Sequence, residues 1–172
     1  MLGLFIIAII TASIATVLGV PIVALNELEL SIASFDYWTV GHFLWGLALF
    51  ILAFTLGWII HNLTGKPKDP INDPEFKKFV LYWVIILFIA ILWEIIENTL
   101  LYVVGIKVKF DSAANIITDI TIWSIGGCVG WYVTDLMFLS DKYLRAYYVY
   151  GFMSLTMGVL IFVIFGFITT NY

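Results

Sequence analysis

Five long apolar runs dominate this chain, and short polar segments separate them. Each run is long enough to cross a bilayer, since a membrane-spanning α-helix needs roughly 20 mainly apolar residues. The runs lack the alternating pattern of barrel strands, and backbone groups in lipid must bond internally, so the runs predict helices. The predicted helices cover about residues 2–25, 38–60, 79–104, 113–138 and 146–168, and Pro21 either kinks the first helix or marks its end.

The composition places residues 1–172 in a single transmembrane domain. The chain is 63% hydrophobic and 12% charged, whereas a soluble domain is about half apolar and about a quarter charged. No segment has the composition of a separate soluble domain. We therefore expect an all-α, polytopic bundle of about five helices that crosses the cell membrane several times and contacts its lipids.

Positive charges predict the orientation of this bundle. The connections at 61–78 and 139–145 together carry six Lys and Arg residues, and those at 26–37 and 105–112 carry two. Because cytoplasmic loops are enriched in Lys and Arg, we expect the N-terminus in the cytoplasm and the C-terminus outside. The first run lacks a positive leader and a clear cleavage site, which favours a retained helix over a signal peptide.

Charge and cysteine content narrow the function classes. The net charge of −4 argues against nucleic-acid binding, which needs a basic face. The single cysteine, Cys128, excludes an internal disulfide, and no Cys/His spacing indicates a zinc site. The small chain leaves room for a homo-oligomer or for a partner in a larger membrane complex.

Polar residues of three predicted helices converge at one depth. One histidine lies about a turn inside the outer end of the second span, and acidic residues lie near the outer end of the third. Positions spaced by four residues enter the fourth span along one face. These residues are His42, Glu94, Glu97, Asn98, Asp111, Asn115 and Asp119.

Such a cluster needs something to balance its charge, because one carboxylate in the bilayer costs about 2.5–3.5 kcal/mol. No Lys or Arg lies inside the second to fourth spans, which favours a cation or bound protons. Oxygen ligands with one imidazole suit a divalent metal ion. Hydrogen bonding between helices is the alternative use of these groups. The predicted ligands are His42, Glu94, Glu97, Asp111, Asn115 and Asp119.

Three short motifs carry a resemblance to a known family. GHFLWG at 41–46, WEIIEN at 93–98 and DSAANIITD at 111–119 resemble the YjdF-like family of small membrane proteins and, more distantly, VanZ-like proteins. The resemblance implies His42, Glu94, Glu97, Asn115 and Asp119 as matching positions. Trp38 stands where the family carries an Asp four residues before the histidine. The resemblance implies no particular reaction.

The leading hypothesis is metal-dependent hydrolysis or group transfer on a lipid-like substrate. Glu94 or Glu97 would act as ligand or general base, and His42 as ligand or proton donor. A proton- or cation-coupled transporter is a second class, because acids inside membranes occur in relays. A structural or assembly subunit of a membrane complex is a third. Metal content, charge movement and co-purification would distinguish them.

Overall fold

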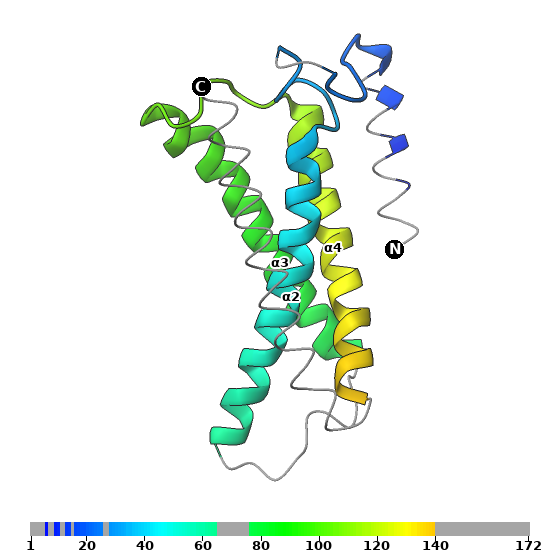
Figure 1. Cartoon of the computed structure of the whole chain (residues 1–172), viewed down its shortest axis with the longest axis vertical. Helices are drawn as coiled ribbons and strands as arrows, with labels where there is room; N and C mark the ends of the chain where they lie inside the picture. The colour runs from blue at the N-terminus through cyan, green and yellow to red at the C-terminus, as the bar shows by residue number, and fades with distance from the viewer. Residues whose placement is uncertain are drawn as a thin grey trace.

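The computed structural model of the chain describes residues 6, 9–10, 13–14, 16–25, 28–64 and 76–139 (Figure 1). Within these residues the architecture is helical, and no strand is present. A bundle is formed by α2 (Tyr37–Leu63), α3 (Phe76–Ile96) and α4 (Ala113–Leu139). A π-helical turn, Glu97–Leu101, directly follows α3.

The three helices confirm the second, third and fourth predicted spans in type and approximate bounds. Each contains a stretch long and apolar enough to cross a membrane: Trp38–Gly57, Phe79–Leu101 and Ala113–Thr134. The fifth run, 146–168, lies outside the described residues. The structure therefore shows a bundle of three such helices among the described residues, and the count of five stays a prediction.

The first run departs from its predicted bounds at its C-terminal end. Its described residues from Ile6 to Val17 are helical. Gly19 then adopts a positive φ of 77°, a conformation that glycine tolerates and that commonly ends a helix. Residues 20–25 follow without helical structure, so the helix ends before Pro21, the alternative end, and does not reach residue 25.

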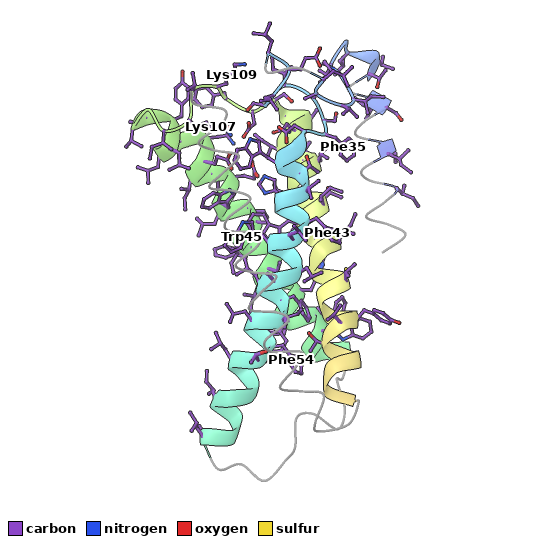
Figure 2. The ribbon with its side chains drawn as sticks, in the orientation of Figure 1. Phe35, Phe43, Trp45, Phe54, Lys107 and Lys109 are labelled. Carbon is purple, nitrogen blue, oxygen red and sulfur yellow. The ribbon has the colours of Figure 1, made fainter. Side chains whose placement is uncertain are left out.

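Glycines bring α2 and α4 into backbone contact. A Cβ at Gly46 would overlap the carbonyl oxygen of Trp123, and one at Gly126 would overlap that of Phe43. Gly130 packs in the same way against the backbone of Leu47. Figure 2 shows Phe43 on the side of α2 that faces α4. Small residues permit such close approach between helices in membranes, and Gly126 and Gly130 have the GxxxG spacing that is typical of it.

Side chains of α3 complete the core beside this contact. Phe50, Ile86, Ala90 and Trp123 are buried together, with one or two contributed by each helix. A second apolar cluster on α2 comprises Leu47, Ile51 and Phe54, with Tyr82 of α3 packed against it. The middle and far part of the bundle is therefore a close-packed apolar core.

The polar end of the bundle is the end where α2 and α4 begin and α3 finishes (Figure 1). We call it the site end. Residues 28–36 lie against this end, because the backbone N–H of Ser112 donates to the carbonyl of Ser31 at 2.7 Å. The Ser112 hydroxyl donates to the carbonyl of Ile32, also at 2.7 Å. The same hydroxyl caps α4 by accepting from the N–H of Asn115 at 3.1 Å.

Candidate functional site

Three helices each contribute one buried ionisable side chain to the site end. His42 comes from α2, Glu94 from α3 and Asp119 from α4. One ligand atom of each lies within 4.8 Å of the others. We call these residues the histidine set. Their exposed fractions are 9%, 4% and 3%, so the structure brings together three of the predicted site residues away from water.

Asp119 has the best-defined contacts of the histidine set. Its Oδ1 accepts a hydrogen bond of 3.0 Å from the Thr39 hydroxyl, and its Oδ2 lies 3.6 Å from Nε2 of His42. The imidazole also packs against Trp123, with ring centroids 5.5 Å apart. Neighbouring helices therefore fix the carboxylate and the imidazole relative to each other.

Two atoms of the histidine set have no hydrogen-bond partner among the described residues. They are Nδ1 of His42 and Oε1 of Glu94, and both are buried. The other Glu94 oxygen accepts only a long contact of 3.4 Å from the Asn98 amide. Because a buried polar atom without a partner costs about 1–3 kcal/mol, these atoms indicate a place for a ligand.

A second charged cluster lies beside the first, and we call Glu97, Lys107 and Asp111 the lysine set. The ammonium of Lys107 donates to Glu97 Oε1 at 2.9 Å and also pairs with Asp111. Figure 2 places Lys107 at the site end, with Lys109 farther from the helices. Burial alone would lower the pKa of Lys107, but the charges and hydrogen bonds of Glu97 and Asp111 raise it above its usual value.

The lysine set corrects one step of the sequence argument. No Lys or Arg lies inside the second to fourth spans, and from this we expected that no lysine would balance the acids. That expectation is wrong for Glu97 and Asp111, which Lys107 bonds. Residues 104–112 fold back over the end of α3, with Gly105 at a φ of 76°. Lys107 in this loop thereby reaches Glu97 and Asp111. The sequence analysis had placed these two acids in one site with Glu94 and Asp119, because all four lie at a similar depth.

Asn98 links the two sets. Its amide nitrogen donates to Asp111 Oδ2 at 2.9 Å and to the Glu94 carbonyl at 3.1 Å. Its oxygen accepts from the N–H of Asp111 at 2.9 Å. Asn98 belongs to the π-helical turn Glu97–Leu101, and such turns often occur at functional sites.

Asn115 is placed differently from the other predicted ligands. Its side-chain nitrogen donates to the carbonyl of Ala33 at 3.0 Å, so the amide holds residues 28–36 against α4. Glu94, Glu97 and Asp111 do offer ligand atoms within 4.8 Å of one another. Lys107 already bonds two of these three acids.

The sequence argument missed Asp36 and Thr39 as parts of the site. Asp36 Oδ1 accepts from the N–H of Trp38 at 2.9 Å and of Thr39 at 3.2 Å, and its own N–H donates to the Thr39 hydroxyl at 3.1 Å. This reciprocal cap starts α2 and aims the hydroxyl at Asp119. Burial raises the pKa of Asp36. The Asp-x-x-Thr spacing before the apolar run was the signal for this cap.

Comparison with known proteins leaves the site to be interpreted on its own geometry. No family model matches the chain. No curated protein and no solved structure is significantly similar to it.

Proposed function

We propose that this chain is a multi-pass protein of the cell membrane that binds one divalent metal ion through His42, Glu94 and Asp119. The ion would serve hydrolysis or group transfer on a lipid-like substrate. One observation carries the proposal: an imidazole and two carboxylates from three helices meet in a buried place, and two of their atoms have no partner within the described part of the chain.

The donor set suits a transition metal ion better than Ca²⁺ or Mg²⁺, which prefer oxygen ligands alone. Nitrogen and carboxylate oxygen bind ions such as Zn²⁺ at about 2.0–2.2 Å. Ligands of one such ion are thus at most about 4.4 Å apart, and the atoms of the histidine set need only a small closing movement from their 4.8 Å limit. Three protein ligands leave a position for water or substrate, as in catalytic zinc sites.

The chemistry follows from these roles. A bound metal ion polarises a phosphoryl or acyl oxygen or lowers the pKa of water. Asp119, held by Thr39, is a fixed ligand, and His42 is a ligand or a proton donor. Glu94 has a free oxygen for a ligand bond or for accepting a proton, and Glu97, bonded to Lys107, is the weaker candidate base.

Depth and orientation support a substrate that resides in lipid. The excess of Lys and Arg at 61–78 and 139–145 favours the site end as the outer side. His42 lies about a turn into its span, roughly 6 Å along the helix from Trp38 at 1.5 Å per residue. A site at that depth lies close to lipid head groups and the ester bonds below them.

Proton-coupled transport has less support. Residues 43–57, 79–93 and 120–134 contain no Asp, Glu, His, Lys or Arg. An acid–base relay therefore has no such carriers along the middle of these helices. An assembly role would require a partner that supplies the missing charge.

Metal analysis of the purified full chain tests the proposal. The wild type should retain Zn²⁺ or Mn²⁺ stoichiometrically, and Glu94→Gln and Asp119→Asn should lose it. Each loss should exceed the roughly 10–100-fold cost of removing an outer-shell partner. Glu97→Gln, the same change three residues away on the same helix end, is the matched control and should keep its metal. Equal metal content in all four proteins would contradict the proposal, and charge movement without metal would favour transport.

A further inference from the structure

Two groups of potential ligands share Glu94. One is the histidine set, and the other consists of Glu94, Glu97 and Asp111, whose ligand atoms also lie within 4.8 Å of one another. A carboxylate that belongs to two such groups is placed to bridge two adjacent cations, as carboxylates do in two-metal sites.

A positive charge of the chain already lies in the second group. The Lys107 ammonium bonds Glu97 and Asp111, and its side chain is only 12% exposed. An ammonium is a compact point charge with three donors, so it can replace a small cation among carboxylate oxygens.

Glu94, the shared residue, indicates that the Lys107 ammonium does not satisfy all of the carboxylates at the site end. Glu94 is 4% exposed, and its Oε1 is buried without a hydrogen-bond partner among the described residues. Among the described residues, the Lys107 ammonium bonds Glu97 and Asp111 and not Glu94. Glu94 thus retains capacity for a ligand although a cation lies beside it.

We propose that Lys107 fills the second position of a paired cation site, so that the protein holds one metal ion where its carboxylates would otherwise bind two. The lysine is a tethered substitute for an ion and restricts the site to a single metal. The inference builds on the proposed metal at the histidine set, but it makes a separate prediction about the number of ions.

Counting bound Mn²⁺ in the full-length protein tests this inference. Lys107→Met should bind one more Mn²⁺ per chain than the wild type at saturation, and the two ions should show spin coupling in electron paramagnetic resonance. The double variant Glu97→Gln/Lys107→Met should lose the additional ion. Lys109→Met is the matched control, because Lys109 belongs to the same loop and is exposed, and its ion count should equal that of the wild type.

Further variants keep the test decisive if Lys107→Met does not fold. Lys107→Gln removes the charge but keeps a donor for Asp111, and it should also gain an ion. Lys107→Arg keeps the charge and should not. If neither neutral variant folds, added Mn²⁺ should restore folding, and failure to restore it would overturn the inference.

The outcomes separate this inference from the proposed function. An unchanged ion count in Lys107→Met would overturn the inference and leave the single-metal proposal intact. A wild type that retains neither Zn²⁺ nor Mn²⁺, beside a Lys107→Met variant that binds one Mn²⁺ through Glu97, would support the inference and contradict the proposed function. Absence of both Zn²⁺ and Mn²⁺ from the two proteins would contradict both proposals.

Discussion

The histidine set and the lysine set each contain two carboxylates, but the charges of these carboxylates are balanced differently. In the lysine set, one ammonium bonds two acids, so charge is balanced within the chain. In the histidine set, Asp119 meets an imidazole and a hydroxyl, and two buried atoms have no partner among the described residues. A loop neutralises the acids that it can reach. Glu94 and Asp119 lie one to two turns deeper and have no ammonium partner among the described residues, which is why we propose a metal ion there.

The largest expected effect comes from separating α2 and α4. The histidine set needs both helices, whereas the lysine set lies on the end of α3 and the loop after it. Gly126→Ala places a Cβ against the Phe43 carbonyl and should destabilise the fold by about 1–3 kcal/mol, the usual cost of overpacking. Metal affinity should fall with it. Thermal unfolding in detergent and metal titration measure the two effects.

Gly127→Ala is the matched control for this change. A Cβ there would meet the nearest atom, Cγ2 of Ile86, at 3.6 Å, an ordinary contact distance. Its unfolding temperature and metal affinity should stay near those of the wild type. Equal effects of both alanines would show that the close contact at Gly126 does not hold the histidine set together.

An intermediate effect should follow from removing the hydroxyl that orients Asp119. Thr39→Val deletes the donor to Oδ1 and should weaken metal binding by roughly 10–100-fold, as loss of outer-shell partners does. Thr39→Ser should restore most of the affinity. Thr55→Val is the control on the same helix, because the Thr55 hydroxyl donates to the backbone carbonyl of Ile51 in its own helix. If Thr39→Val and Thr55→Val bind metal equally, Asp119 does not depend on Thr39.

The smallest effect should come from changing Asp36. Backbone N–H groups, and not a cation, bond the carboxylate of this residue. Asp36→Ala should cost about 0.5–2 kcal/mol of stability, as loss of a helix cap does, and Asp36→Asn should cost less. Burial raises the pKa of Asp36 above its ordinary value of 3.8, so the ionised form is disfavoured in the folded state. Wild-type stability relative to Asp36→Asn should therefore fall as the pH rises above that value. Unfolding at several pH values measures it, and the opposite trend would contradict the assignment.

The sequence predicted α2, α3 and α4 and the meeting of His42, Glu94 and Asp119 because both depend on local properties. Apolar length sets where α2, α3 and α4 lie, and a rise of 1.5 Å per residue sets relative depth. Spacing by three or four residues then places acids on one face. No knowledge of contacts between segments was needed for these steps.

Sequence reasoning failed where a segment folds back. The position of Lys107 depends on a left-handed Gly105 and on hydrogen bonds from Asn98 to Asp111, and neither has a periodic signature. Asn115 fits the ligand spacing, but its side chain donates to the carbonyl of Ala33. Ala33 lies 82 positions earlier in the chain, and no sequence pattern links the two residues. Asp36 and Thr39 did have a recognisable cap spacing, and it was overlooked.

The π-helical turn at Glu97–Leu101 has a consequence for how this protein tolerates length changes. A π turn corresponds to one additional residue within an α-helix, and one residue rotates an α-helix by about 100°. Deleting a single residue here would restore regular α winding and swing the following loop to another side of α3. The lysine would then be carried away from its acids, although the apolar stretch Phe79–Leu101 would be shorter by only one residue.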